Sequence, residues 1–254
     1  MKMKKLIAQL TLFFCFSVVK AQTINIPDVA FERELLTQGV DLNGDGKIQK
    51  NEAQKVTILY VKNQGIKDLE GLTNFTNLIE FGCYGNQIKN LDVSKLKKLQ
   101  YFYANNNLLQ SININGLVEL KHIYLHNNPD LYINIDFLQF KKLEELHIES
   151  TRTPKLDLKN LKNLKIVDAS NSRLTEIEIE GCDNLEQIWL ENNQIVSIDF
   201  KQLTKISFIT LSYNPLKTID IRQLKNLKKF SCLDCYNLKQ INTSGCENLE
   251  PILW

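Results

Sequence analysis

The sequence lacks the features that mark several specialised classes of protein. Ten glycines and five prolines among 254 residues are too few for a collagen-like or linker-rich chain. Basic and acidic residues nearly balance, at 31 against 29, so the chain has no basic field of the kind that favours nucleic acid. Hydrophobic residues make up 43% of the chain, which is enough to bury a large core and excludes a disordered protein.

Catalytic motifs are also lacking. The chain contains no G-x-S-x-G, no H-E-x-x-H, no P-loop and no glycine-rich dinucleotide turn. Glu145, His147 and Glu149 alternate along one segment and imitate an acid–base cluster. An open repeat face, however, offers no enclosed pocket that would exclude water from a reaction. We therefore expect that the protein is not an enzyme.

Long hydrophobic runs are restricted to the N-terminus. Three lysines in Met1–Lys5 precede the almost wholly apolar segment Leu6–Val19, and small or β-branched residues follow. This pattern predicts a secretory signal peptide over residues 1–21, because the apolar run is too short to span a bilayer. We expect a mature chain from Gln22 with no membrane span, secreted or extracellular, with periplasm or cell surface as alternatives. Loss of four lysines leaves 27 basic residues against 29 acidic ones, a net charge of −2.

A repeat of about 21 residues organises the rest of the chain. The pattern L-x-x-L-x-L-x-x-N-x-L recurs at intervals of 21 to 23 residues. Its units start at Val56, Leu78, Leu99, Leu120, Leu143, Leu164, Leu185, Ile206, Leu227 and Leu249. Each unit predicts a short strand over positions three to seven, with positions four and six pointing inward. Position nine is asparagine in five units, where its side chain can pair buried backbone groups of neighbouring turns; these are Asn86, Asn107, Asn128, Asn193 and Asn214.

Units such as LIEFGCYGNQI and LEQIWLENNQI resemble leucine-rich repeats over about 200 residues. The short period and the opening segment GIKDLEGLTNFTNL are similar to bacterial internalin-like surface proteins. The resemblance implies an α/β fold, namely a curved leucine-rich-repeat solenoid with a parallel sheet on its concave face and a small helical cap. It also implies surface recognition or adhesion. We expect the cap at residues 22–55 and repeats at 56–254, as nine full units and a truncated tenth whose open end favours self-association.

The repeat register assigns every cysteine of the expected mature chain to an interior position. These are Cys83, Cys182, Cys232, Cys235 and Cys246. Cys232 and Cys235 form a C-x-x-C pair, which elsewhere indicates zinc binding or redox chemistry. Here the register favours small buried hydrophobic side chains. A disulfide between the two is compatible with an oxidising compartment but is not required.

The segment before the repeats contains a calcium-binding pattern. Residues 41–52 match D-x-[DN]-x-[DN]-G-x5-E, the EF-hand loop, with Gly46 at the sharp turn. The predicted ligands are Asp41, Asn43, Asp45, the carbonyl of Lys47, Gln49 through water, and Glu52. The loop departs from an EF-hand because the first repeat begins at Val56, leaving little room for an exit helix, and because no second loop pairs with it. We predict a structural calcium ion that locks the cap onto the solenoid; a metal-free surface turn is the alternative.

Aromatic side chains fall at the outward positions three, five and seven of the predicted strands. Exposed tyrosine and tryptophan are typical of binding surfaces, although cross-strand packing is an alternative reason for them. The predicted partner-binding residues are Tyr60, Tyr84, Tyr101, Tyr103, His122, Tyr124, His126, His147, Trp189 and Phe208. We expect an extracellular or host protein as partner, with a glycan as the alternative. His122 and His126 lie roughly 13 Å apart along a strand, too far to share one ion, which leaves pH-tuned binding as a weaker hypothesis.

Overall fold

The computed structural model describes residues 22–252 of the chain. The predicted signal peptide at residues 1–21 therefore lies outside the described residues. The helices are α1 (Val29–Thr37), α2 (Lys50–Ala53), η1 (Leu72–Asn74) and η2 (Phe137–Gln139). The strands are β1 (Ile58–Tyr60), β2 (Glu80–Gly82), β3 (Asn90–Asp92), β4 (Tyr101–Tyr103), β5 (Ser111–Asn113), β6 (His122–Tyr124), β7 (Glu145–His147), β8 (Lys155–Asp157), β9 (Ile166–Asp168), β10 (Glu176–Glu178), β11 (Gln187–Trp189), β12 (Phe208–Thr210) and β13 (Lys229–Ser231).

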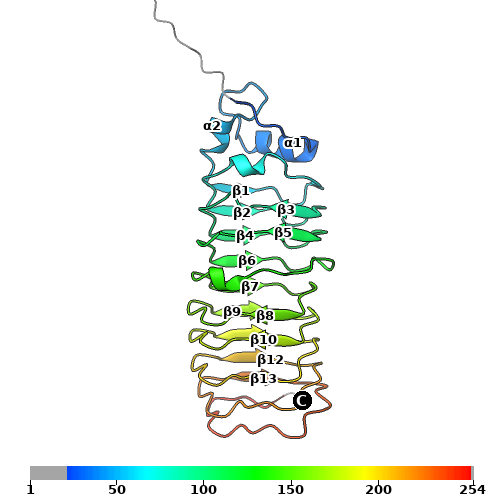
Figure 1. Ribbon diagram of the computed structural model, residues 1–254, viewed down its shortest axis with the longest axis vertical. Coiled ribbons are helices and arrows are strands. Elements are labelled where there is room, and N and C mark those ends of the chain that lie inside the picture. The colour runs from blue at the N-terminus through cyan, green and yellow to red at the C-terminus, as the bar shows by residue number, and fades with distance from the viewer. Residues whose placement is uncertain (1–21, 253–254) are drawn as a thin grey trace, which may run out of the picture.

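Nine of these strands form one parallel sheet along the length of the molecule (Figure 1). Their order is β1-β2-β4-β6-β7-β9-β11-β12-β13, with one strand from each full repeat unit. Position four pairs with position four throughout, as in Leu59 with Phe81 and Phe81 with Phe102. The strands cover three residues rather than the predicted five. The backbone ladder nevertheless continues past them, since Val61 donates its N–H to the Gly82 carbonyl at 2.8 Å.

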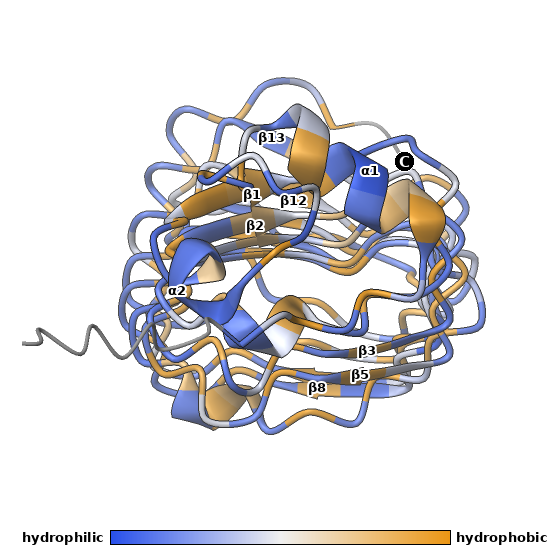
Figure 2. Ribbon diagram, turned by 90° about the horizontal axis from the view of Figure 1, so that it is seen from above, coloured by the Kyte–Doolittle hydropathy of each residue, from blue (hydrophilic) through white to orange (hydrophobic). Residues whose placement is uncertain are grey.

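The opposite side of the coil also carries extended chain. Strands β3 and β5 pair there, as do β8 and β10, and an isolated bridge joins Asp199 to Asp220. Figure 2 shows β3, β5 and β8 across the core from β1, β2, β12 and β13. Extended chains stack about 4.8 Å apart, so both sides of the coil rise at nearly the same rate. The column in Figure 1 consequently bends little. We call the outward side of the nine-stranded sheet, formed by positions three, five and seven, the sheet face.

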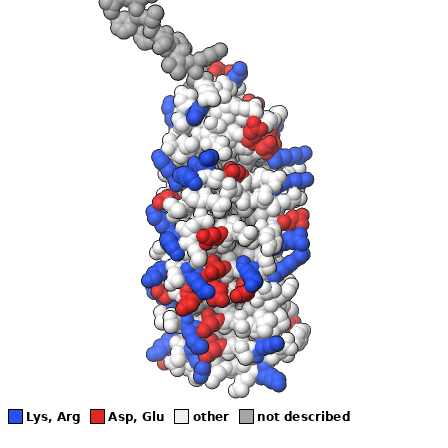
Figure 3. Space-filling view, viewed as in Figure 1, with Lys and Arg blue, Asp and Glu red and all other residues white. Residues whose placement is uncertain are grey.

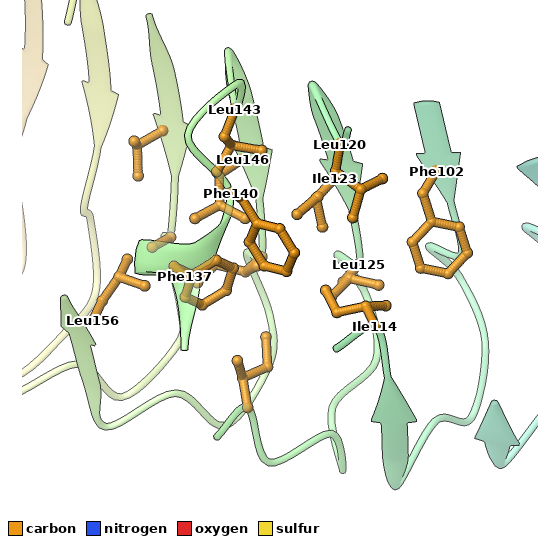
Figure 4. Close-up of a cluster of buried hydrophobic side chains, with 14 of the residues drawn as sticks. Phe102, Ile114, Leu120, Ile123, Leu125, Phe137, Phe140, Leu143, Leu146 and Leu156 are labelled. Atoms are coloured by element: carbon orange, nitrogen blue, oxygen red, sulfur yellow. The ribbon is translucent and has the colours of Figure 1, made fainter. Parts of the chain in front are cut away.

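The core is a continuous apolar column inside the coil. Positions four and six are buried in every full unit, as Leu146 and Ile148 illustrate, because alternate residues of a strand point to opposite sides. Around the 23-residue interval, the short helix η2 sends Phe137 into the same interior, and Phe140 packs beside it at a ring-centroid distance of 6.1 Å (Figure 4). The longer unit is therefore accommodated without a break in the core.

Buried asparagines pair the backbone where the chain leaves the sheet. The Asn107 carbonyl oxygen accepts from the Ile88 N–H at 3.1 Å, and its amide nitrogen donates to the carbonyls of Cys83 and Ala104 at 3.0 and 3.2 Å. Thr151 and Ser172, which replace asparagine in two units, both donate to the Ile148 carbonyl. The predicted role of position nine is thus confirmed.

The cap closes the N-terminal end of the core. Helix α1 begins after Asp28, whose Oδ1 accepts from the N–H groups of Ala30 and Phe31 at 2.9 and 3.0 Å. Phe31 and Leu35, one helical turn apart, point into the interior. Helix α2 is a single turn of four residues that begins at Lys50, within the last three positions of the predicted calcium loop, and ends at Ala53.

The cysteines of the described chain are free thiols, and four of the five are buried as the repeat register predicts. Cys83, Cys182, Cys232 and Cys235 are buried and Cys246 is partly exposed. Burial raises the pKa of the Cys182 thiol to about 11, which makes that thiol unreactive at neutral pH. In the C-x-x-C pair, a thiol–thiol hydrogen bond lowers the pKa of Cys235 and raises that of Cys232.

Candidate binding face and cap loop

The aromatic side chains of the sheet face contact one another in a row that crosses the strands. Tyr60 stacks near Tyr103 with ring centroids 6.2 Å apart, Tyr103 lies 5.1 Å from Tyr124, and Tyr124 stacks on His147 at 4.3 Å. The row stops at Asp168 on β9. All ten predicted partner-binding side chains lie on this face and are half-buried. Cross-strand packing therefore accounts for part of their burial, while each keeps exposed area for contact.

A second aromatic pair follows beyond the gap. Trp189 on β11 and Phe208 on β12 have ring centroids 5.0 Å apart. The structure thus divides the predicted residues into a long row on β1 to β7 and a separate pair on β11 and β12. Tyr101 joins the long row through His122 at 5.0 Å, and Tyr84 joins it through Tyr60 at 6.4 Å.

Gly82 makes room for the first contact of the row. It occupies position five of β2, between Tyr60 on β1 and Tyr103 on β4. A Cβ atom built on Gly82 would overlap the Tyr60 ring, so the missing side chain lets this ring cover the glycine and reach Tyr103. Gly82 was not among the site residues predicted from the sequence. The sequence signal for this contact was a glycine at position five of its unit, where both neighbouring units have tyrosine.

Carboxylates fix two of the tyrosines. The Tyr60 hydroxyl donates to Glu80, and the Tyr124 hydroxyl donates to Glu145. Burial, together with these carboxylates, raises the pKa of both phenols. The two rings are therefore held in one orientation, and their hydroxyl groups stay protonated at neutral pH.

Histidines and acids gather at the end of the long row. His126 Nδ1 lies 3.5 Å from Glu149 Oε1, and His147, Glu149 and Asp168 each place one atom within 4.8 Å of the others. Burial raises the pKa of Glu149 to about 7, and the nearby Asp168 adds to this shift. Burial also lowers the pKa of His126 and of His147. His122 lies one step further away, with its Nδ1 3.9 Å from Glu145 Oε2, the oxygen that also lies 3.8 Å from His147 Nε2.

The predicted calcium ligands lie together in the cap loop. Asp41 accepts from the N–H groups of Gly44 and Gly46 at 2.8 and 2.7 Å, which closes the turn. The Gln49 amide nitrogen lies 3.0 Å from both Asp45 carboxylate oxygens and 3.3 Å from the Lys47 carbonyl. These three oxygens accept hydrogen bonds from the Gln49 amide nitrogen, which lies between them, and carboxylate and carbonyl oxygens are the ligand atoms that Ca2+ prefers.

Two further contacts complete the loop. The Glu52 carboxylate accepts from the N–H groups of Leu42 and Gln49 at 2.9 and 2.8 Å, so in this conformation it faces the backbone. The chain before α1 runs alongside, with an antiparallel bridge between Thr23 and Gln49 and a 2.8 Å hydrogen bond from Ile24 to the Ile48 carbonyl. The loop therefore pairs with an extended segment rather than with a second loop.

The side opposite the sheet face offers a groove of a different character. It runs along β8 and β10 toward Asp199 and Asp220, and its lining alternates charged and apolar residues. Lys155 and Glu176 form an ion pair there at 2.7 Å. On the surface seen in Figure 3, charges of both signs are interspersed. Between residues 22 and 252, no helix has the length and apolar character to cross a membrane.

Comparison with known proteins supports the same fold. A profile described as leucine rich repeats in two copies matches residues 162–205. The functional domain of InlJ from Listeria monocytogenes, which includes a cysteine ladder, is 22% identical with a TM-score of 0.61 over 91% of this chain. The match spans 63% of that domain. No curated protein sequence matches the chain.

Two other solved structures extend the comparison. Internalin C2 from Listeria monocytogenes is 19% identical, with a TM-score of 0.65 over 90% of this chain and 99% of that one. The plant peptide hormone receptor RGFR1, in complex with RGF2, is 22% identical, with a TM-score of 0.58 over 78% of this chain and 38% of that one. The fold is accordingly a leucine-rich-repeat solenoid with a small helical cap, of the kind that Listeria internalins share.

Proposed function

We propose that this protein is a secreted, non-enzymatic binding module that recognises a protein partner through its sheet face. The row of half-buried aromatic rings on β1 to β7 carries the proposal. Tyrosine and tryptophan contribute most to binding energy at protein interfaces. Stacking and the hydroxyl bonds to Glu80 and Glu145 restrict these rings before a partner arrives, so less side-chain entropy is lost on binding. The likeness to internalins and to a peptide-bound receptor agrees with such a role.

The test is capture of extracellular proteins by the purified chain, compared with a Tyr103→Ala/Tyr124→Ala variant. We expect a protein that the wild type retains and the variant loses, because the variant removes two adjacent rings of the row. A matched control, Lys155→Ala/Glu176→Ala, changes the opposite side and should retain the same protein. Circular dichroism of all three proteins checks that they are folded. Equal retention by the Tyr103→Ala/Tyr124→Ala variant, or loss in the control, would contradict the proposal.

A glycan partner is the second candidate, favoured by the Trp189–Phe208 pair. Aromatic rings stack on the apolar faces of sugar rings, and this pair lies apart from the long row. Glycan-array binding that disappears in Trp189→Ala would support it. An array without signal above background would exclude it for the glycans displayed.

We also propose that the loop at residues 41–52 holds a calcium ion that stabilises the cap. Asp41, Asn43, Asp45, Lys47, Gln49 and Glu52 are the proposed ligands, and the ion would supply positive charge where their oxygens gather. Binding to the folded state alone would raise the melting temperature in proportion to the logarithm of calcium concentration. Asp45→Ala should remove that dependence, whereas Asp130→Asn, outside the loop, should keep it. The same melting curve with millimolar calcium and with excess chelator would refute the site.

Secretion rests on the sequence of residues 1–21 and is tested separately. Expression of the complete chain in a bacterial host with a secretion pathway should yield a product outside the cytoplasm whose N-terminal sequence starts at Gln22. A product that keeps Met1 and stays in the cytoplasm would contradict it.

A further inference from the structure

The cluster at the end of the aromatic row has the composition of a metal site. His147 on β7, Glu149 just after β7 and Asp168 on β9 bring one ligand atom each to within 4.8 Å of the others. It is the one such group of three that residues 22–252 contain. His126 approaches from the neighbouring unit, with Nδ1 3.5 Å from Glu149 Oε1. We propose that these four residues bind a divalent transition-metal ion, with Zn2+ as the representative case.

The sheet register explains why the four side chains meet. Parallel pairing places His147 beside Asp168 on the next strand, about 4.8 Å away. Glu149 lies two residues beyond His147 on the same outward side, and His126, two residues beyond Tyr124, is the neighbour of Glu149 in the preceding unit. The four residues therefore form a staggered set over three neighbouring units, with Glu149 and His147 in the middle unit about 7 Å apart along the chain. His147, Glu149 and Asp168 converge to within 4.8 Å, and His126 approaches this group from the side of Glu149.

Unpaired polar atoms in the cluster point to a missing ligand. Glu149 Oε2 and His126 Nδ1 are shielded from solvent, and neither has a hydrogen-bond partner in the described part of the chain. An unpaired buried polar atom destabilises the folded state. The carboxylates of Glu149 and Asp168 also repel each other at this distance. A bound cation removes both penalties, because it accepts the lone pairs and neutralises the negative charge.

The donor set selects the class of ion. Imidazole nitrogens combined with carboxylate oxygens suit zinc and related transition metals, whereas calcium prefers oxygen ligands alone. The cluster and the cap loop thus differ in chemistry as well as in place. Tyr124 stacks on the His147 ring at 4.3 Å and holds it over the cluster. The inference does not depend on whether the sheet face binds a partner.

Isothermal titration of the untagged, chelator-treated protein with ZnCl2 tests the site. We expect one Zn2+ per chain, with affinity reduced at least about tenfold in Asp168→Asn and in His147→Ala. Co2+ in place of Zn2+ should give a visible absorption band that both variants lose. Asp168→Asn is nearly isosteric, so it remains decisive even if His147→Ala folds poorly, and circular dichroism monitors both.

Three control variants separate this site from other metal-binding groups of the chain. His122→Ala removes an imidazole on the same face outside the cluster, Cys232→Ser removes a thiol of the C-x-x-C pair, and Asp41→Asn alters the cap loop. All three should bind Zn2+ as the wild type does. No Zn2+ uptake by the wild type, or wild-type affinity in Asp168→Asn and His147→Ala, would overturn the proposal. Loss of binding in Cys232→Ser or Asp41→Asn would do so too.

Discussion

At the scale of single residues, the buried asparagines show how one side chain supports several backbone groups. Asn128 is fully buried, and its carbonyl oxygen accepts from the Leu109 N–H at 3.0 Å. Its amide nitrogen donates to the carbonyls of Ala104 and Leu125 at 3.1 and 2.7 Å. These groups belong to two successive turns of the coil, so the side chain links neighbouring units where the sheet ladder ends.

Asn128→Ala should lower the free energy of unfolding by about 2–4 kcal/mol, because it leaves buried backbone groups unpaired. Urea unfolding followed by circular dichroism measures the loss. Asn115→Ala is the matched control, since Asn115 is exposed and its side chain makes no hydrogen bond within residues 22–252. The control should stay within about 0.5 kcal/mol of the wild type. A loss below about 1 kcal/mol in Asn128→Ala would show that water replaces these bonds.

Gly82 and Tyr60 form a second residue-scale unit, and a double-mutant cycle can test it. Alanine in a strand is normally more stable than glycine by about 0.5–1 kcal/mol. Here Gly82→Ala should instead destabilise the protein by about 1–2 kcal/mol, because the new methyl group displaces the Tyr60 ring. In a Tyr60→Ala background the same change should be neutral or stabilising. Urea unfolding of all four proteins gives the coupling energy between the two positions. A coupling energy near zero would show that Gly82 and Tyr60 contribute to stability independently.

The sequence predicted individual positions well where alternation along a strand decides them. Positions four and six lie inside and the aromatic positions outside, because a strand has a period of two. Contacts between units were not predictable in the same way. That His147 and Glu149 meet Asp168, and that Tyr60 leans over Gly82, depends on side-chain conformation across strands, which one repeat unit does not encode.

At the scale of elements, the cap is joined to the first repeat through Asp28. Its Oδ1 caps helix α1, and its Oδ2 accepts from the N–H groups of Lys67 and Asp68 at 2.8 and 3.2 Å. Partial burial alone would raise the pKa of Asp28, but its backbone N–H donors outweigh this and hold the pKa below the ordinary value. One carboxylate thus starts a helix and fixes the loop that follows β1.

Asp28→Ala should lower stability at pH 7 by about 1–2 kcal/mol, the usual effect of removing a helix N-cap. Because the folded-state pKa is lowered, this contribution is complete above the unfolded value, near 3.9, and is lost as pH falls through the folded value. Thermal unfolding of both proteins at pH 7 and at low pH measures this. The difference in melting temperature should shrink on acidification; a constant difference would assign the effect to packing rather than to charge.

The repeat pattern predicted some elements and missed others, because it covers only part of each unit. The repeat pattern placed one strand of the nine-stranded sheet in each full unit. It did not indicate strands β3, β5, β8 and β10, because the pattern ends before them. A signal was present in Asn90-Leu91-Asp92-Val93, where polar and apolar residues alternate. In the cap loop, the motif named the candidate ligands but not the turn of Glu52 toward backbone N–H groups.

At the scale of the whole molecule, the coil is stabilised mainly by contacts between adjacent repeat units. Each inner strand of the main sheet pairs with the strands directly before and after it in the sheet, from β1 at one end to β13 at the other. The core is a continuous column, yet its layers contact mainly the next layer. Stability in such an array is the sum of unit and interface terms, so a local defect should act locally.

Hydrogen exchange in two variants can test this locality. Phe31→Ala removes a fully buried ring of the cap, and Leu146→Ala removes a fully buried side chain of β7; such changes cost about 2–5 kcal/mol. Under native conditions, Phe31→Ala should speed amide exchange in β1 and β2 while β11 and β12 stay as in the wild type. Leu146→Ala should instead affect β6, β7 and β9 most, because these strands share the layers beside the cavity. Mass spectrometry of exchanged peptides resolves the strands, and an equal increase in all nine would mean that the solenoid opens as one cooperative unit.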